Sequence, residues 1–461
     1  MHKVIINNKI YLAENGTVLS DILKNNYIYH EHVCNGMGIC KKCTVLVNGK
    51  KVLSCQYKIT SDITVSTIES EDIYSETGVT ETRKTTENCC FCLDIGTSTL
   101  ALALVSLDEN AIIKVSTCTN PQRIFGADVI SRIDYCQKNG VKEMHRVLIN
   151  KVNELIESFN IETVKEMYVS GNTTMLHLFF GVDCSQMGVS PYTPVFLESK
   201  RKNAKSLNIT GVETIESLPS VSAFFGADLV AGMNFTGTQK NGRYNLILDL
   251  GTNAEIVLFS DKNVFCTSAA AGPCFEGGNI SHGMSATSGA VYSYSKNKVR
   301  VINNTIPKGI CGTGLIDVIA VFLENNIIDK TGFLESDEVE ITNGVFIEQN
   351  DVRQYQLAKS AIFSGIVTLL KEKNVSYDDI DCFYISGGFS SVINIENAVK
   401  TGLFPKELKE KCVTINNSSL LGTIKYAYEK NDLSQYTEKA EYIDLSLNSY
   451  FCVEFIKNIN F

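Results

Sequence analysis

One short pattern occurs twice in this chain of 461 residues, and its repetition constrains the fold more than any other feature does. The letters DIGTST occupy positions 94–99 and the letters DLGTN occupy positions 249–253, each between two apolar runs. Each copy predicts a buried strand, a tight turn that contains glycine and threonine, and a returning strand. Two hairpins of one kind, far apart in the sequence, predict two lobes built on the same α/β plan.

The residue types in the two turns suit phosphate binding. Backbone N–H groups and hydroxyls of such a turn cradle phosphate oxygens, and the aspartate before it is placed to hold Mg²⁺, directly or through water. We therefore expect Asp94 and Asp249 to be the catalytic carboxylates of a site for ATP and Mg²⁺. The expected phosphate-binding residues are Gly96, Thr97, Ser98, Thr99, Gly251, Thr252 and Asn253.

A second pair of segments follows the same duplication. YVSGNTT at 168–174 and YISGGFSS at 384–391 each predict an apolar strand that ends in small residues before a helix, a place where ligands commonly bind. One hairpin with a Gly-Thr turn is weak evidence by itself, because many hairpins contain it. Two such hairpins, each followed by a strand–Ser-Gly–helix segment, form a strong joint signal.

These paired segments resemble the actin, sugar-kinase and chaperone-ATPase superfamily. Members of that superfamily have two lobes of ribonuclease-H-like fold and bind nucleotide in the cleft between them. The resemblance makes 94–99 the first phosphate loop and 249–253 the second. It makes Gly387, Gly388 and Phe389 the adenosine loop.

Four other stretches carry candidate residues, some with open alternatives. Gly312 opens a predicted helix within GICGTG (309–314), so it is expected either to bind nucleotide or to begin a tightly packed helix between the lobes. Glu276, in the small-residue loop 269–289, is the candidate for orienting a water molecule in catalysis. Asp128 and Asp228 each end a Phe-Gly-Ala-Asp segment, and we favour helix caps over cleft carboxylates for both.

Four cysteines near the N-terminus form a different kind of site. Cys34, Cys40, Cys43 and Cys55 read C-x5-C-x2-C-x11-C, a tight loop with a distant fourth thiolate that suits a [2Fe–2S] cluster. Zinc prefers paired C-x2-C knuckles, of which this stretch has one, and a disulfide framework fits less well still. Predicted hairpins on both sides of the loop and a short helix before it complete the pattern. We expect an α+β ferredoxin domain of the β-grasp type with these four metal ligands.

Composition narrows the remaining possibilities. A formal charge of −9 and the lack of a basic block argue against a nucleic-acid partner. No apolar run reaches transmembrane length and the chain starts with a predicted strand rather than a signal peptide, so we expect no membrane partner. Sixteen cysteines without an export signal indicate a reducing cytoplasm. We interpret Cys90 and Cys92 as core thiols and His177 as a local hydrogen-bonding residue.

A change of composition divides the chain. Residues 67–88 are rich in Ser, Thr, Glu and Asp and nearly lack apolar side chains beyond Ile73, as a linker does. We assign the ferredoxin domain to 1–66 and the linker to 67–88. The first ATPase lobe is assigned to 89–240 and the second to 241–461.

A ferredoxin domain fused ahead of an ATPase of this type is similar to the reductive activators of corrinoid proteins. The likeness extends to NPQRIFGADVISRI at 120–133 and to the segments 171–178 and 269–284. It implies an ATP-hydrolysing activase that transfers one electron from the cluster to an inactive Co(II) corrinoid methyl-carrier protein or methyltransferase and restores Co(I). It also implies a low-potential electron donor and a homodimer. Because the linker runs almost directly into Asp94, we expect no middle domain of the kind found in larger relatives.

Two alternative functions use the same ferredoxin and ATPase domains for another purpose. In the first, the chain is an ATP-dependent electron donor to another low-potential metalloenzyme. In the second, it is a redox-sensing, ATP-binding module that docks a partner according to the state of the cluster. A small-molecule kinase is disfavoured, because an electron carrier has no place in phosphoryl transfer.

Overall fold

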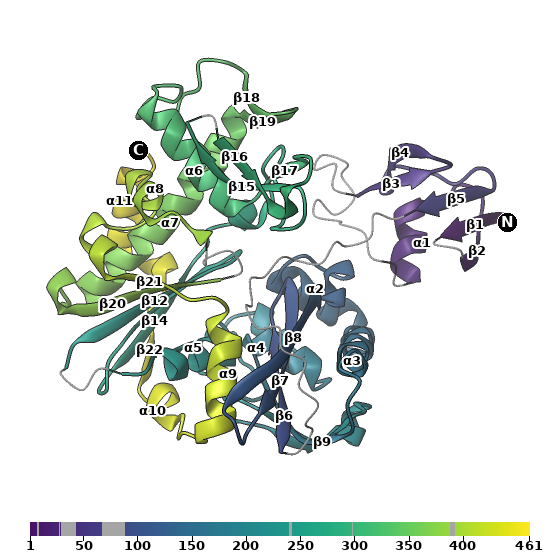
Figure 1. Cartoon of the computed structure of the whole chain (residues 1–461), viewed down its shortest axis with the longest axis horizontal. Helices are drawn as coiled ribbons and strands as arrows, with labels where there is room; N and C mark the ends of the chain where they lie inside the picture. Colours follow the sequence, from purple (N-terminus) through teal and green to yellow (C-terminus); the bar gives the residue numbers. More distant parts are fainter. Residues whose placement is uncertain are drawn as a thin grey trace.

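The computed structural model of the chain contains three separate large or medium-sized sheets, and Figure 1 shows them as distinct parts of the molecule. It describes residues 1–6, 9–26, 28, 43–66, 88–238, 242–296, 298–387 and 392–461. Among the helices of these residues, none combines the length and the apolar character that a membrane crossing needs.

The N-terminal sheet has five strands in the order β2-β1-β5-β3-β4. Its elements are β1 (His2–Ile6), β2 (Lys9–Ala13), α1 (Leu19–Asn25), β3 (Thr44–Val47), β4 (Lys50–Leu53) and β5 (Ile63–Ser66). Strand β5 runs parallel to β1, while β2 and β4 pair in antiparallel hairpins as predicted. Positive φ at Asn48 and Gly49 gives the tight turn between β3 and β4. Leu19 and Leu23 of α1 pack into the core of this sheet.

The second sheet has six strands in the order β10-β11-β9-β6-β7-β8 and defines the first lobe. Its strands are β6 (Cys89–Ile95), β7 (Thr99–Ser106), β8 (Ala111–Thr119), β9 (Val164–Gly171), β10 (Arg201–Asn203) and β11 (Val212–Ser217). Its helices are α2 (Val129–Asn139), α3 (Lys142–Glu157), α4 (Thr173–Phe179) and α5 (Ala227–Thr236). Cys90 and Cys92 are fully buried in β6, which confirms their interpretation as core thiols.

The third sheet repeats this plan in the second lobe, in the order β21-β20-β12-β13-β14-β22. Its strands are β12 (Tyr244–Leu250), β13 (Ala254–Phe259), β14 (Val264–Ala269), β20 (Ile380–Ser386), β21 (Cys412–Thr414) and β22 (Ala440–Tyr442). In both lobes three consecutive strands pair in antiparallel fashion. Two further strands continue the sheet on the other side of the first of these strands, and they run parallel to it. The predicted duplication is therefore present in the strand order.

Smaller elements surround the third sheet. The helices are α6 (Gly312–Glu324), α7 (Gln349–Glu372), α8 (Ile395–Lys400), α9 (Ser418–Glu429), α10 (Ser434–Thr437) and α11 (Ser449–Lys457). Two small sheets are formed by β15 (Ala290–Ser295), β16 (Lys298–Val301) and β17 (Gly309–Ile310), and by β18 (Glu338–Thr342) and β19 (Val345–Glu348).

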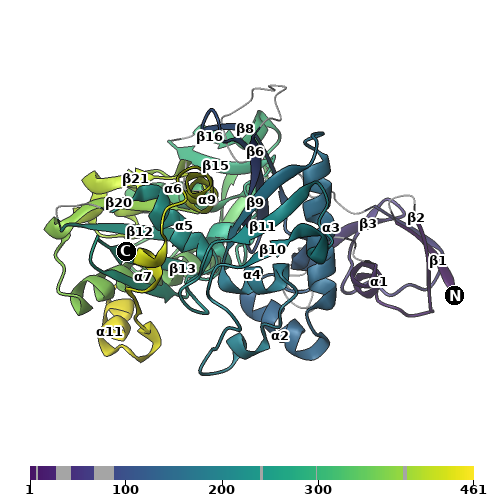
Figure 2. The same cartoon turned by 90° about the horizontal axis from the view of Figure 1, so that it is seen from below.

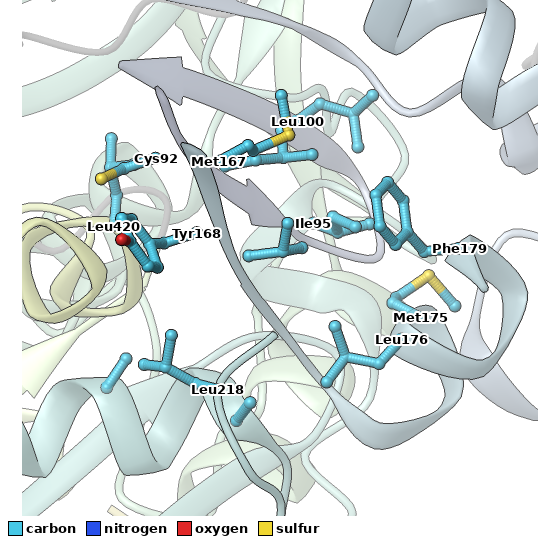
Figure 3. Close-up of a cluster of buried hydrophobic side chains, with 14 of the residues drawn as sticks. Cys92, Ile95, Leu100, Met167, Tyr168, Met175, Leu176, Phe179, Leu218 and Leu420 are labelled. Atoms are coloured by element: carbon cyan, nitrogen blue, oxygen red, sulfur yellow. The ribbon is translucent and has the colours of Figure 1, made fainter. Parts of the chain in front are cut away.

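Helix α9 lies between β21 and β22 of the second lobe in sequence but packs on the first lobe. Leu420 and Ile424 belong to the same buried cluster as strand β6, and Figure 3 shows Leu420 beside Tyr168 and Cys92. Helices α5 and α9 lie side by side between the two large sheets (Figures 1 and 2). A Cβ atom on Gly422 would lie 1.8 Å from the carbonyl oxygen of Ala231, so only glycine permits this close crossing. The α5–α9 pair therefore joins the lobes.

Candidate functional site

The two predicted phosphate turns occupy equivalent positions in the two lobes. The turn after β6 closes with a bond from the N–H of Gly96 to the carbonyl of Thr99, and the turn after β12 closes from Gly251 to Asn253. Each turn lies at the end of two interior strands of its sheet, next to the C-terminal end of a parallel strand, β9 or β20. The structure thus brings each aspartate–turn segment beside its Ser-Gly segment, as the paired order of the sequence predicts.

The strand register makes this equivalence explicit. Asp94 lies beside Ser170 on the neighbouring strand, and Asp249 lies beside Ser386. The glycine that follows each serine is required, because a Cβ on Gly171 would lie 2.7 Å from the carbonyl oxygen of Ile95 and one on Gly387 2.3 Å from that of Leu250. Both glycines also have positive φ, 153° and 119°. Of the predicted adenosine loop, Gly388 and Phe389 lie outside the described residues.

The N-terminus of α9 contacts both of these strand pairs. Ser419 Oγ donates to Asp94 Oδ1 at 2.7 Å, and Asn417 Nδ2 donates to Asp94 Oδ2 at 2.9 Å. The hydroxyls of Ser419 and Ser170 lie 2.8 Å apart, and those of Ser418 and Ser386 lie 2.7 Å apart. Consecutive serines of one helix therefore hold equivalent serines of two lobes.

Glu276 connects the two turns directly. It ends the short 3-10 helix η4 (Pro273–Glu276), and its Oε1 accepts from Ser98 Oγ at 3.1 Å while its Oε2 accepts from Thr252 Oγ1. One carboxylate thus bonds a hydroxyl of each predicted phosphate loop. The structure places Glu276 between the loops, where a phosphate-binding cleft is expected, and both of its oxygens accept hydroxyl hydrogen bonds.

Several half-buried carboxyls crowd the second turn. Burial, with the nearby charges of Asp94 and Glu276, raises the pKa of Asp249 to about 6, although a hydrogen bond from Ser386 opposes the shift. Burial and the charges of Asp249 and Asp94 raise the pKa of Asp228 to about 7. Glu255, directly across the hairpin from Asp249, has its pKa raised well above the usual value by burial and these neighbours. A cation would relieve this concentration of negative charge.

Asp94 is better compensated than Asp249. Burial raises its pKa, while the hydrogen bonds from Ser419 and Asn417 act in the opposite direction. Within the described part of the chain, no three His, Cys, Asp or Glu side chains stand close enough to enclose a metal ion. Mg²⁺ commonly takes only one or two carboxylates and keeps several waters, so a pair of these aspartates fits its chemistry.

The two Phe-Gly-Ala-Asp segments differ. Asp128 caps α2, since its Oδ1 accepts from the N–H of Ser131 at 2.7 Å, which confirms the prediction. Asp228 lies inside the first turn of α5, whose N-cap is Gly226, so it does not occupy the N-cap position, although its Oδ1 accepts from the N–H of Leu229 in that turn at 2.9 Å. The charges of Asp249 and Asp94 also act on this carboxyl, as the cleft alternative implies. The sequence could not distinguish the roles of the two aspartates, because both follow the same three residues, Phe-Gly-Ala.

Gly312 lies where the packing of α6 needs a glycine. A Cβ at this position would lie 2.4 Å from the carbonyl oxygen of Phe275, the residue before Glu276. The start of α6 is therefore pressed against the segment that carries Glu276. Close helix packing accounts for this glycine, and its nucleotide contact stays a prediction.

Several residues near the turns were not identified from the sequence. Asn120, Arg132 and Asn172 hydrogen-bond the first turn from inside the lobe, and Ser418 and Ser419 contact both lobes. All are distant in sequence from the turn they contact. The one available signal was the segment 120–133, which the family resemblance singled out without giving roles to its residues. His177 is confirmed as a local hydrogen-bonding residue, with ring nitrogens paired to Thr173 and Val195.

The N-terminal cysteine site is described in part. The Sγ atoms of Cys43 and Cys55 lie 3.2 Å apart and both side chains are buried. A disulfide would need about 2.05 Å, whereas two thiolates on one tetrahedral metal at about 2.3 Å each lie about 3.8 Å apart. The separation of 3.2 Å excludes a disulfide and leaves two buried neighbouring thiols that a shift of a few tenths of an ångström would bring to the spacing of two metal ligands. Cys34 and Cys40 lie outside the described residues, so the four-ligand prediction stays a prediction.

Family models match most of the chain. Residues 243–461 match the C-terminal domain of RACo, described as the ASKHA domain, and residues 89–241 match the RACo middle region. The first match supports the predicted actin and sugar-kinase-like fold for the second lobe. The second overturns the expectation that no middle domain is present, because the predicted first ATPase lobe is itself the region that matches.

Individual proteins agree with these matches. The chain is 29% identical to the corrinoid activation enzyme RamQ of Eubacterium limosum over 74% of this chain and 64% of that protein, so it spans less than two thirds of RamQ. It is 27% identical to the [Co(II) methylated amine-specific corrinoid protein] reductase of Methanosarcina barkeri over 76% of this chain and 72% of that protein. A solved reductive activator for corrinoid, iron-sulfur protein is similar over 100% of this chain and 98% of its own, with 25% identity and a TM-score of 0.73.

Proposed function

Because this chain belongs to the RACo family of reductive activators of corrinoid proteins, we propose that it is an ATP-dependent activase. In this proposal it transfers one electron from a [2Fe–2S] cluster to an inactive Co(II) corrinoid protein and regenerates Co(I). The acceptor is a corrinoid methyl-carrier protein or methyltransferase, and a low-potential donor supplies the electron. The proposal places the chain in a reducing cytoplasm, as a homodimer.

The contact of Glu276 with both turns is the observation that carries the nucleotide half of the proposal. Hydroxyls of Ser98 and Thr252 meet on one carboxylate, so the two phosphate loops lie close enough for a single polyphosphate to contact both. Asp249, with Asp94 or Asp228, would hold Mg²⁺, since their charges already perturb one another. Gly96, Thr97, Ser98, Thr99, Gly251, Thr252 and Asn253 would bind the phosphates, and Gly387, Gly388 and Phe389 the adenosine.

The close Cys43–Cys55 thiol pair supports the cluster half of the proposal. These two residues, with Cys34 and Cys40, would hold the cluster, which supplies a one-electron carrier with a potential of about −400 mV in proteins of the plant-ferredoxin type. The buried position of the pair limits contact of their sulfurs with water. Residues 1–66 would then be the ferredoxin domain and 67–88 the linker.

The reduction potentials explain why one chain would combine an ATP site with an iron–sulfur cluster. The Co(II)/Co(I) couple is expected to lie below the cluster, and each deficit of about 59 mV for one electron lowers the equilibrium yield tenfold. ATP shifts such an equilibrium only if it binds one conformation more tightly than another. Two loops on two lobes, linked through Glu276 and α9, offer two conformations whose difference a shared nucleotide would sense.

The direct test mixes the reconstituted protein with a low-potential reductant and a Co(II) corrinoid methyl-carrier protein under anaerobic conditions. The visible Co(I) band should appear with ATP and stay small without it. Cys55→Ser should abolish the band, whereas Cys452→Ser, a change on the exposed face of α11, should not affect it. ATP hydrolysis and a reducible cluster without any Co(I), across several corrinoid proteins, would favour another low-potential metalloenzyme as the acceptor.

A further inference from the structure

The first phosphate turn is held from behind by a buried arginine. Arg132, on α2, is 0% exposed, and its Nη2 donates to the carbonyl oxygen of Thr97 at 2.6 Å. Its Nε donates to the carbonyl of Gly126 at 3.0 Å, and its Nη1 lies 3.0 Å from the thioether sulfur of Met175. Figure 3 shows Met175 beside Phe179 among the buried apolar side chains. The guanidinium thus lies between the turn and the hydrophobic core.

Asn120 assists the arginine. It is also 0% exposed, its Nδ2 donates to the carbonyl of Gly96 at 2.8 Å, and its N–H donates to the carbonyl of Ser98 at 2.9 Å. Three consecutive carbonyls of the turn, those of Gly96, Thr97 and Ser98, therefore bond groups on the inner side of the lobe. An extended strand would alternate their directions, so this alignment is specific to the turn.

The direction of the carbonyls fixes the direction of the amides. In a planar trans peptide the C=O of one residue points opposite to the N–H of the next. The N–H groups of Thr97 and Ser98 consequently point away from Asn120 and Arg132, toward the side on which Ser98 meets Glu276. Within the described residues neither N–H group has a hydrogen-bond acceptor. Two adjacent unpaired amides on one side of a turn form an anion-binding nest.

The charge of Arg132 is not neutralised by a direct partner. Across the ranges that the structure describes, no carboxylate lies within salt-bridge distance of the guanidinium, and its three hydrogen-bond partners are two carbonyls and a sulfur. Burial and the charge of Arg123 lower its pKa to about 9, against the weaker influence of Asp128 and Glu276. A buried charge without a partner costs stability, so packing alone would favour a neutral side chain at this position.

We propose that Arg132 is the positioning residue of the first phosphate loop, holding its amides toward the nucleotide and placing a positive charge one peptide unit behind the bound phosphate. This inference rests on the proposed ATP-binding function and adds a residue to it. Arginine suits the task better than lysine, because its planar fork reaches the carbonyls of Thr97 and Gly126 together. Asn120 supports the same arrangement.

The test compares nucleotides that differ in phosphate number. Affinities for ATP, ADP, AMP and adenosine are measured calorimetrically for the full-length protein and for Arg132→Gln, Arg132→Lys and Asn120→Asp. Arg146→Gln is the matched control, since Arg146 lies on α3 in an exposed ion pair with Glu143. Arg132→Gln should weaken ATP binding about 10- to 100-fold, the usual range for loss of a charged hydrogen-bond partner, and leave adenosine binding nearly unchanged.

The other variants separate positioning from folding. Arg132→Lys should restore part of the lost ATP affinity, and Asn120→Asp should weaken ATP more than adenosine, because a carboxylate cannot donate to the carbonyl of Gly96. If Arg132→Gln does not fold, these two variants decide by the same comparison. Unchanged ATP affinity, or an equal loss for ATP and adenosine in a folded variant, would overturn the inference. A wild-type protein that binds no ATP would instead contradict the proposed function itself.

Discussion

At the scale of single residues, the carboxyls around the second turn have a measurable consequence. The pKa of Asp228 is raised to about 7 and that of Asp249 to about 6, chiefly by burial. A carboxyl with a raised pKa binds its proton more tightly in the folded state than in the unfolded chain. The folded state therefore gains stability from protonation below this pKa and loses that stability as the pH rises toward it.

This linkage predicts the behaviour of Asp228→Asn. The wild-type protein should become less stable toward unfolding as the pH rises from about 4 to about 7, the interval between the ordinary and the raised pKa. The neutral amide removes the contribution of Asp228, so the variant should melt about 2–4 °C higher than wild type at about pH 8, and by less at about pH 5. Thermal melting followed by circular dichroism at both pH values measures the difference, and Asp261→Asn serves as a control on a hairpin turn of β13–β14. An equal change at both pH values would contradict this assignment.

At the scale of elements, the strand–glycine junctions position the site. Gly171 and Gly387 lie against the carbonyls of Ile95 and Leu250, so each lets a parallel strand end next to a predicted phosphate turn. The contact is between backbones, and neither lobe offers a flexible side chain that yields space at these points. The same local solution in both lobes indicates that the approach of strand end to turn is a requirement of the fold.

Alanine at either junction should be costly. Gly387→Ala and Gly171→Ala should each lower the free energy of unfolding by about 2 kcal/mol or more, because a Cβ contacts backbone and φ is positive. Gly140→Ala is the matched control, since Gly140 also has positive φ, 76°, but no atom lies within 4 Å of the position that its Cβ would take. Denaturant unfolding of the three variants separates the two effects. A loss no larger at Gly387 than at Gly140 would show that the backbone contact has no energetic weight.

The sequence could predict those elements that are determined by neighbouring residues. The hairpins, the Ser-Gly strand ends and the duplicated order are encoded in neighbouring residues, and the structure contains them. The roles of Arg132, Asn120 and the N-terminus of α9 depend on segments that meet only after folding. No local sequence periodicity indicates that a helix encoded within one lobe packs against the other lobe. From sequence alone, an arginine on an amphipathic helix is expected to be exposed to solvent, so the burial of Arg132 could not be predicted.

At the scale of the whole molecule, the lobes share one buried hydrophobic cluster, and a small set of polar side chains also connects them at the two turns. Asp94 is held by Ser419 and Asn417 from α9, and Glu276 joins Ser98 to Thr252. A nucleotide that binds both loops would compete for or reinforce these same groups. The proposed coupling of ATP to electron transfer therefore depends on the cleft between the lobes, at a distance along the chain from the cysteine site.

The most direct test of this coupling removes the proposed magnesium carboxylate while leaving the proposed cluster site unchanged. Asp249→Asn is reconstituted anaerobically, its iron and sulfide contents and its reduction are checked against wild type, and Co(I) formation from a Co(II) corrinoid protein is then followed with ATP. We predict a normal, reducible cluster and a rate of Co(I) formation lowered on the order of 100-fold, a typical loss when a charged group that stabilises the reacting phosphate is removed. Co(I) formation at the wild-type rate would contradict the claim that the duplicated turns drive the electron transfer.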